Sequence, residues 1–320
     1  MRKLSYLLIA LAFLLNACEE SNDLPVCGIS EPLNGSEIAK GEIVTISVYA
    51  DDNDGEIKEV EYYLDNSLIG AVDSLPYNLE WNSTKSENKE VTIKVVVKDN
   101  SGGIATDEAV VSVKRYTGTI SDYDGNTYKT VKIGNQWWMA ENLRTTHYSD
   151  GTEINLIEDD AEWDDAYNNI DAYCFYNNSN KNADKYGALY NWYAVGNSSK
   201  NVCPDGWHVP NKSEWSELVE YLGSVGYSGI EGGALKATSL WKKDEESNDG
   251  NGTDNFGFRA LPAGLRSSGF SASGYVADFW SSTEQSGMSG YWFHISTYNK
   301  KYNISPIGKS MGFSVRCIKN

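Results

Sequence analysis

Histidine and positive charge are both scarce in this chain of 320 residues, which has three histidines and 27 lysines and arginines against 45 aspartates and glutamates. His147, His208 and His294 have no partner at the spacing of a metal site or a catalytic triad, and the sequence contains no GxSxG, HExxH or P-loop motif. We therefore expect a protein that is not an enzyme. The alternative is a polysaccharide hydrolase, because the carboxylate pair of such an enzyme is defined by separation in space.

The shortage of positive charge also narrows the choice of partner. The formal net charge of −18 becomes −20 when residues 1 to 17 are removed, because Arg2 and Lys3 leave with them. Binding to nucleic acid needs clustered lysine and arginine against the phosphates, so we expect no nucleic-acid partner. The negative charge favours solubility, and bound cations are the alternative explanation for it.

The sequence also lacks an apolar run long enough to span a bilayer, which takes about 20 residues. The apolar run of residues 4 to 15 follows Arg2 and Lys3 and leads into LNAC at residues 15 to 18, which resembles a lipobox. The resemblance implies a signal peptide over residues 1 to 17, a lipid on Cys18 and a polar tether over residues 18 to 25. An ordinary cleaved signal and a short membrane anchor are the alternatives.

Acidic residues follow the lipobox directly, at Glu19, Glu20 and Asp23. They resemble the surface-export signal of some Gram-negative lipoproteins, and a solvated tether is the alternative explanation. From the resemblance we expect a protein held in the outer membrane by its lipid and facing the cell exterior.

Cysteine is sparse as well, with five residues in the chain. Once Cys18 carries lipid, the remaining four are Cys27, Cys174, Cys203 and Cys317, which allow three complete pairings that the sequence cannot distinguish. We favour a disulfide between Cys203 and Cys317, which would tie the approach to a central helix to the final strand. The cysteines show no CxxC motif or cluster with histidine, so we expect no zinc site.

Residues 26 to 115 have the pattern of a β-sandwich. Apolar residues alternate with polar ones around Ile46, Val60, Val95 and Val111, and Asn-Gly, Asp-Gly and Gly-Gly turns separate these runs. The string DDNDGEIKEVEYYLDNSLIG, at residues 51 to 70, resembles a bacterial immunoglobulin-like domain. The resemblance implies a spacer or an adhesive module.

The composition changes at residues 115 to 118, where we place the domain boundary. Nine of the ten tryptophans, sixteen of the 21 tyrosines and seven of the eight phenylalanines lie at residue 116 or later. Aromatic side chains bury about 150 to 250 Å² each, so residues 116 to 320 can be held together by ring packing with little regular structure. We expect this second domain to be loop-rich and of the α+β class.

The clearest helix signal of the chain follows Pro210. Asn211 is a favourable N-cap, and Glu214 completes a capping box three residues later. Apolar residues recur after it at helical spacing, and Gly223 is a candidate for a left-handed stop. We expect the second domain to be built around this helix, whose apolar stripe is Trp215, Leu218, Val219 and Leu222.

Six strings along the second domain carry a family resemblance: DYDGNTYKTVKIGNQWWMAENL (122 to 143), YGALYNWYAV (186 to 195), CPDGWHVPNKSEW (203 to 215), FRALPAGLR (258 to 266), FWSSTE (279 to 284) and SVRC (314 to 317). Together they resemble the Fibrobacter succinogenes major paralogous domain, a surface-protein domain without a settled function. WYAV and HVPNKSEW also resemble a pattern of formylglycine-generating-type domains, which implies a C-type-lectin-like fold. The activity of those enzymes does not carry over, because Cys317 has no second thiol near it in the sequence.

The first of these strings contains two candidate sites. Asp122, Asp124 and Asn126 could hold a calcium ion, and the alternative is a turn whose carboxylates cap local amides. Residues 127 to 133 and 136 to 140 predict a hairpin, in which Trp137 and Trp138 point to opposite faces. One of these two rings must then be core, and the other packs under a loop or contacts a ligand.

The ligand we expect is a glycan or a protein partner. Sugar rings present apolar faces to tryptophan, and their hydroxyls bond to carboxylates, so Trp280 and Asp278 join the tryptophan pair as candidates. Lectins that bind sugars through calcium usually carry an EPN or QPD motif and a WND motif. This sequence contains none of them. We therefore expect an adhesion module on a spacer, with a purely structural surface protein as a further alternative.

Other elements of the second domain are expected from shorter patterns. Residues 159 to 167 and 232 to 240 predict short helices, and residues 278 to 282, 290 to 296 and 312 to 318 predict strands, the last in the middle of a sheet. Residues 242 to 257 are polar until Phe256 and predict a surface loop. This loop is a candidate rim for a ligand site.

Overall fold

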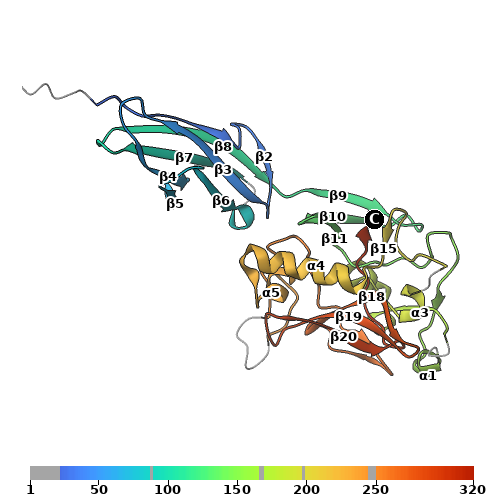
Figure 1. The fold of residues 1–320 in the computed structure, drawn as a ribbon. Helices are drawn as coiled ribbons and strands as arrows, with labels where there is room; N and C mark the ends of the chain where they lie inside the picture. Colours follow the sequence, from blue (N-terminus) through green and yellow to red (C-terminus); the bar gives the residue numbers. More distant parts are fainter. Residues whose placement is uncertain (1–21, 87–88, 166–168, 197–198, 244–249) are drawn as a thin grey trace, which may run out of the picture. The chain divides into compact units, whose positions relative to one another are not determined.

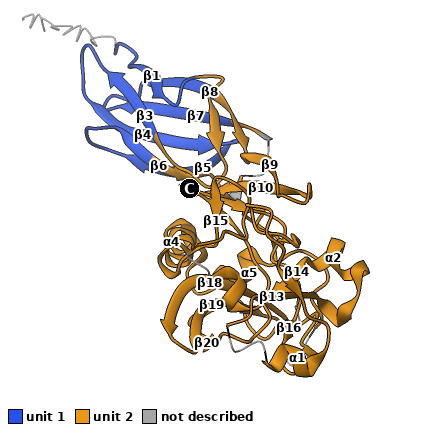
Figure 2. Ribbon diagram, turned by 90° about the vertical axis from the view of Figure 1, so that its right-hand side faces the viewer, with its two compact units in different colours: residues 1–33, 46–79, 92–109 blue, residues 34–45, 80–91, 110–320 orange. Residues whose placement is uncertain are grey.

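The structure is a computed structural model, and it describes residues 22–86, 89–165, 169–196, 199–243 and 250–320 (Figure 1). Most of the regular structure is strand. Two compact units are distinguished in Figure 2. Unit 1 takes the chain up to Leu33 together with Ile46–Leu79 and Thr92–Ala109, and unit 2 takes Asn34–Thr45, Glu80–Val91 and Val110–Asn320.

The amino-terminal strands form two sheets. They are β1 (Val26–Glu31), β2 (Glu37–Ala39), β3 (Ile43–Asp51), β4 (Ile57–Leu64), β5 (Ser67–Val72), β6 (Asn78–Asn82), β7 (Lys89–Asp99) and β8 (Ile104–Lys114). The sheet orders are β1-β3-β6 and β2-β8-β7-β4-β5. The alternation predicted from the sequence is confirmed, because Ile46, Val60, Val95 and Val111 are buried while their chain neighbours are more exposed.

The later strands form several smaller sheets. They are β9 (Thr117–Ser121), β10 (Thr127–Ile133), β11 (Gln136–Met139), β12 (Asn155–Leu156), β13 (Ala172–Phe175), β14 (Ala188–Tyr190), β15 (Trp207–His208), β16 (Leu265–Arg266), β17 (Phe270–Ser271), β18 (Val276–Ser286), β19 (Ser289–Ser296), β20 (Tyr302–Gly308) and β21 (Ile318–Lys319). Their orders are β15-β21-β11-β10-β9, β12-β13-β14, β16-β17 and β18-β19-β20. The predicted hairpin of β10 and β11 is confirmed, with Ile133 opposite Gln136.

Helices are short apart from one. They are α1 (Asp160–Asp165), α2 (Asn180–Tyr186), α3 (Trp192–Val195), α4 (Lys212–Leu222) and α5 (Glu231–Leu235), with 3-10 turns at Ser83–Lys85 and Tyr176–Asn178 and a π-type turn at Gly223–Tyr227. Helix α4 begins as predicted, because Asn211 Oδ1 accepts the Glu214 amide and Glu214 Oε2 accepts the Asn211 amide. It lies against β18 and β19 (Figure 1).

The ring of Trp215 lies at the centre of the largest apolar cluster. It is fully buried, stacks on Phe293 at 4.4 Å between ring centroids, and lies 4.7 Å from Trp138 and 5.8 Å from Phe279. The stripe predicted for α4 is confirmed, since Leu218, Val219 and Leu222 belong to the same cluster. The helix therefore positions the strands of this region through its aromatic contacts.

Several details differ from the sequence-based expectations. Gly223 is not a left-handed stop: its backbone is helical, and the chain continues through the π-type turn until Gly226, at φ 94°, reverses it. The second helix, α5, ends at Leu235 rather than at residue 240. Strand β20 was not predicted. Of the strand expected at residues 312 to 318, only Ile318 is in a strand, β21, which is paired to both β11 and β15.

Candidate functional site

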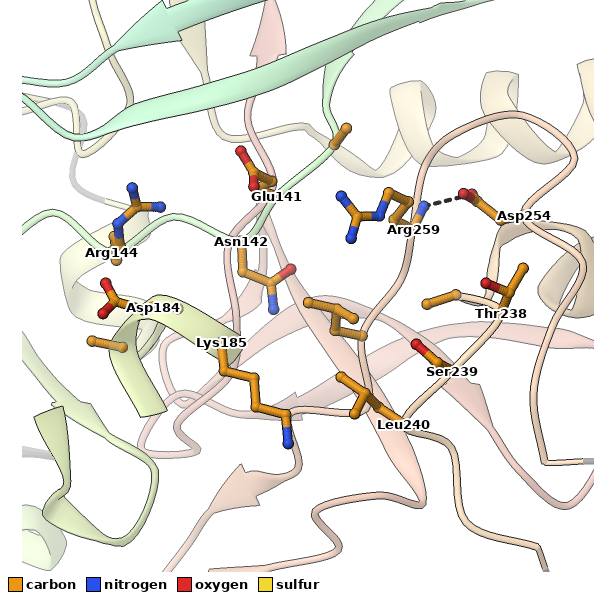
Figure 3. Close-up of a pocket in the computed structure, with 15 residues that line it drawn as sticks. Glu141, Asn142, Arg144, Asp184, Lys185, Thr238, Ser239, Leu240, Asp254 and Arg259 are labelled. Atoms are coloured by element: carbon orange, nitrogen blue, oxygen red, sulfur yellow. Dashed lines mark hydrogen bonds between the residues drawn. The ribbon is translucent and has the colours of Figure 1, made fainter. Parts of the chain in front are cut away.

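A polar cavity of about 280 Å³ is a candidate site in the part of the chain that the structure describes (Figure 3). Its walls come from the segment after β11, the end of α2, the segment after α5 and the chain before β16. Charged side chains of both signs line it. The labelled lining residues are Glu141, Asn142, Arg144, Asp184, Lys185, Thr238, Ser239, Leu240, Asp254 and Arg259.

Arg316 connects two walls of the cavity, because it bonds to both Asn142 and Arg259. Its buried guanidinium donates from Nε to Asn142 Oδ1 at 2.6 Å, from Nη2 to the Arg259 carbonyl at 2.8 Å, and from Nη1 to the carbonyls of Met139 and Phe258. Its carbon atom Cζ lies 4.7 Å from the ring centre of Phe258. Burial lowers the pKa of Arg316 to about 9, so the guanidinium stays protonated at neutral pH while it holds two cavity walls.

The backbone of Arg259 is held in a left-handed conformation, with φ 52°. For a residue with a Cβ this conformation costs about 1–3 kcal/mol and persists only where the surroundings impose it. Here the Asp254 carboxylate accepts the Arg259 amide at 2.9 Å, and Arg316 binds the Arg259 carbonyl. Asp254 and Arg316 are therefore positioning residues: they fix the backbone of Arg259, and with it the direction in which its side chain leaves the backbone.

Three of the nine described non-glycine residues with a positive φ line this cavity. Leu240 (φ 75°) and Asp254 (φ 45°) also line it in left-handed conformations. Backbone strain of this kind gathers at ligand sites, where it orients side chains in advance. The conformations of Leu240, Asp254 and Arg259 make the cavity a candidate for a ligand site.

The charged groups at the rim differ in how they are paired. Burial raises the pKa of Asp254 above its ordinary value, while the bond from the Arg259 amide opposes this shift. Glu141 accepts the Lys129 amide with Oε2. The guanidinium of Arg259 makes no hydrogen bond or ion pair with the described residues, and Figure 3 shows it turned toward Asn142.

The residue types that line the cavity limit the kinds of ligand that it could bind. Among the described residues that line the cavity there is no aromatic ring, histidine or cysteine. A ligand there would be recognised through hydrogen bonds and charge, and the apolar contacts would come from Ala140, Ala183, Ala237, Leu240 and Leu261. A hydroxyl-rich ligand suits such a surface, because carboxylates accept its hydroxyls and amide and guanidinium groups donate to its oxygens.

The aromatic candidates from the sequence are placed elsewhere. Trp138 and Trp280 are fully buried, so the predictions that they face a ligand are wrong: Trp138 packs on Trp215, and the Trp280 indole donates to the Tyr190 carbonyl at 2.7 Å. Trp137 is partly buried against neighbouring apolar residues and stays a candidate. The prediction that one ring of the Trp137 and Trp138 pair is core is confirmed.

Asp278 is also buried, so the prediction that it contacts a ligand is wrong. Its Oδ1 lies 2.6 Å from Nδ1 of His294, the residue opposite it on β19. Burial raises the pKa of Asp278 to about 6, and the bond to His294 opposes that rise. The pair is a buried link between β18 and β19.

The predicted calcium site is instead a capped turn. Asp122 accepts the Asn126 amide, the Asn126 side chain and the Tyr128 hydroxyl. Asp124 accepts from Thr145 and Thr146 and contacts His147, so the two carboxylates serve different partners. Across the described residues, no group of three His, Cys, Asp or Glu side chains could hold a metal ion. The structure shows the alternative to a metal site, in which the carboxylates cap local groups.

His208 is half-buried, and both of its ring nitrogens lie within hydrogen-bond distance of a partner. Its Nε2 lies 2.8 Å from Glu214 Oε1, and its Nδ1 lies 2.6 Å from Asn320 Oδ1. Since Glu214 Oε2 accepts the Asn211 amide, one carboxylate serves both the capping box and the histidine. The helix start is therefore linked to the end of the chain.

The favoured disulfide is present between Cys203 and Cys317, which are both buried. Cys27 and Cys174 are free thiols, and burial raises the pKa of Cys174 to about 11. The predicted signal peptide and lipid-bearing Cys18 lie outside the described residues. Within the described ranges, no helix has the length and apolar content needed to cross a membrane.

Sequence reasoning did not identify the cavity residues, although a signal was available. Three strings of the family resemblance meet there: MAENL supplies Glu141 and Asn142, YGALY supplies Gly187, and FRALP supplies Arg259. Asp254 lies in the polar loop predicted as a rim, whose residues 244–249 are outside the described part. A lone arginine inside the apolar run FRALPAGL was the usable signal.

Comparison with known families confirms the resemblances to the Fibrobacter succinogenes major domain and to a bacterial immunoglobulin-like domain. The model of the Fibrobacter succinogenes major domain matches residues 131–319, and the model of a bacterial Ig domain matches residues 25–95. A search of curated proteins finds no match to this chain.

Solved structures resemble small parts of the chain. They include the fibronectin(III)-like modules of Clostridium thermocellum CbhA (26% identity, TM-score 0.26, 28% of this chain and 47% of that chain). They also include the PKD1 domain of Vibrio anguillarum Epp (19%, 0.22, 29% and 98%) and the endo-beta-1,4-mannanase from Thermotoga petrophila (16%, 0.25, 30% and 21%). At these TM-scores the likeness says nothing about the activity of this chain.

Proposed function

The chain belongs to the Fibrobacter succinogenes major domain family, and from this premise we propose that it is a non-catalytic glycan-binding protein of the cell surface. Its immunoglobulin-like domain acts as a spacer, and the cavity around Arg259 binds the glycan. The observation that carries this proposal is the strained, doubly held backbone of Arg259, which presents a charged group at a polar cavity. Such preparation in advance of binding is typical of ligand sites.

The attachment to the membrane is part of the same proposal. Lipid on Cys18 anchors the protein in the outer membrane, residues 18 to 25 form the tether, and the domains meet at residues 115 and 116 with a C-type-lectin-like fold in the second. Replacing Cys18 by serine should move the protein from the membrane fraction to the soluble fraction. Protease treatment of intact cells should remove the wild-type domains, and full protection would contradict display on the surface.

Glycan binding is tested on an array with the full chain, with and without calcium. Ser239 is exposed at the cavity, so Ser239→Trp should block the entrance and abolish array signals with little effect on folding. Ser268→Trp is the matched control, because Ser268 is exposed but does not line the cavity. Signals that are uniformly absent, or that Ser239→Trp leaves unchanged, would contradict the proposal.

A polysaccharide hydrolase remains the second candidate, because Glu141, Asp184 and Asp254 bring carboxylates to one cavity. Burial raises the pKa of Asp254, and a raised pKa is what a general acid needs. Release of reducing ends by the wild type, lost in Asp254→Asn, would replace binding by hydrolysis. Asparagine is the suitable variant because it tolerates the left-handed backbone and keeps an acceptor for the Arg259 amide.

A further inference from the structure

Arg259 lies between two cavities. Besides the polar cavity already described, a second one of about 560 Å³ lies over β9 and β10 and reaches the segments around Ala140 and Gly257. Arg259 and Ala140 line both. A ligand that fills the first cavity therefore meets the Arg259 side chain on its way to the second.

The charged residues that line the second cavity are all positive. Its charged lining residues are Arg115, Lys129 and Arg259, and no aspartate or glutamate is among the described residues that line it. Thr119 faces Lys129 across the β9 and β10 pair, so their side chains lie on the same face of the sheet. Cations and hydroxyl groups are thus gathered on one surface of a chain whose net charge is −18.

The Arg259 guanidinium is suited to an external anion. It has no hydrogen-bond or ion-pair partner among the described residues, and its backbone is fixed by Asp254 and Arg316. The planar guanidinium donates two parallel hydrogen bonds to a carboxylate, and a fixed backbone lowers the entropy lost when they form. A side chain prepared in this way marks the position of a carboxylate in the ligand.

We propose that Arg259 binds the carboxylate of an acidic oligosaccharide that contains uronic acid units and runs from the polar cavity onto the face of β9 and β10. Lys129 makes a second, weaker contact with the chain of sugars. This inference rests on the proposed glycan binding and adds the class of ligand and the residue that selects it.

The lining favours an acidic sugar over other anions. The first cavity is lined by the carboxylates of Glu141, Asp184 and Asp254 and by the cationic groups of Arg144 and Lys185, so it offers both acceptors and donors to hydroxyl groups. A uronic acid unit carries hydroxyls and a carboxylate together, so it matches carboxylates on one side and Arg259 on the other. The acidic side chains of a peptide lack those hydroxyls, so they would donate no hydrogen bond to the carboxylates of Glu141 and Asp184.

The test is calorimetry of the full chain with tetragalacturonate, its fully methyl-esterified form and hexaglutamate. Arg259→Asn, which suits the left-handed backbone, should weaken tetragalacturonate binding roughly tenfold to a hundredfold, since a bond to a charged group contributes about 1.5–3 kcal/mol. Lys129→Gln should weaken it roughly twofold to fivefold, as for an exposed ion pair. Lys301→Gln is the control, because Lys301 is exposed and lines neither cavity.

The outcomes separate this inference from the proposed function. Equal affinity for tetragalacturonate and its ester, or no loss in Arg259→Asn, would overturn the role of Arg259 even while glycan binding stands. Equal or tighter binding of hexaglutamate would overturn the choice of an acidic sugar. Failure of every glycan on the array would overturn the proposed function itself.

Discussion

The amino-terminal strands and the carboxy-terminal region are held together in different ways. Strands β3, β4 and β7 bury alternating aliphatic side chains, and their backbone groups are satisfied within two sheets. The carboxy-terminal region packs aromatic rings around Trp215 and satisfies loop carbonyls with buried arginines: Arg316 serves three of them, and Arg266 serves those of Ile157, Glu158 and Asp159.

This difference in how the backbone is held affects which region can contain a binding site. A regular sheet leaves its backbone little freedom, whereas side-chain donors can fix irregular backbone in conformations that sheets exclude. Arg316 bonds both to Asn142, which lines the cavity, and to the carbonyl of the left-handed Arg259. The irregular region thus has the means to present a prepared side chain.

The largest expected effect comes from removing the central ring. Trp215→Ala should lower the free energy of unfolding of the carboxy-terminal region by about 3–5 kcal/mol, because it leaves a cavity beside Phe293 and Trp138. Hydrogen exchange read by mass spectrometry should show lost protection in α4, β18 and β19. Equal loss in β3, β4 and β7 would show that the two regions unfold as one, and the comparison would fail.

A smaller effect is expected from the disulfide between Cys203 and Cys317, which closes a loop of sequence separation 114. Its reduction should destabilise the carboxy-terminal region by about 2–4 kcal/mol. The measurement is urea unfolding followed by tryptophan fluorescence, with and without dithiothreitol. Cys27→Ser, which removes a free thiol of β1, should leave the midpoint unchanged. A midpoint that does not respond to reductant would contradict a stabilising role for this bond.

The smallest effect is a pH dependence from His208 and Glu214. The bond to Glu214 raises the pKa of His208 above 6.5 against burial. Burial would raise the pKa of Glu214, but bonds from His208 and the Asn211 amide lower it below 4.5. The histidine contribution is complete below 6.5 and is lost as pH rises through the raised pKa. The carboxylate contribution is complete above 4.5 and is lost as pH falls through the lowered pKa.

The pair therefore stabilises most between about pH 4.5 and 6.5. Urea unfolding from pH 4 to pH 8 should show the deficit of His208→Gln greatest in that window and shrinking toward alkaline pH. Glu217→Gln alters an exposed carboxylate on the same helix and should follow the wild-type profile. A deficit of constant size across the range would mean that His208 acts through packing alone.

Local patterns in the sequence predicted much of the fold. The alternation around Ile46 and Val60 and the capping box of Asn211 and Glu214 correspond directly to strands and to α4. These features depend on neighbours within a few residues, so propensity and periodicity suffice to find them. Strand β20 has a weaker pattern and exists because it pairs with β19.

Such local patterns could not predict the candidate site. Asn142, Asp254, Arg259 and Arg316 are far apart in the sequence and meet only through side-chain bonds to loop carbonyls and amides. The aromatic residues misled for a related reason: composition shows that rings are abundant but not which are buried, and Trp280 proved to be core. The distinction between core ring and ligand platform needs tertiary contacts.

The most direct test of the central claim observes the Arg259 side chain during binding. Nitrogen-detected spectra of arginine Nε–H groups, recorded on the full chain, identify the Arg259 signal by its disappearance in Arg259→Asn. Tetragalacturonate should shift this signal in proportion to occupancy, while the signal of buried Arg316 should move little. Binding of tetragalacturonate with an unmoved Arg259 signal would show that Arg259 does not contact the ligand.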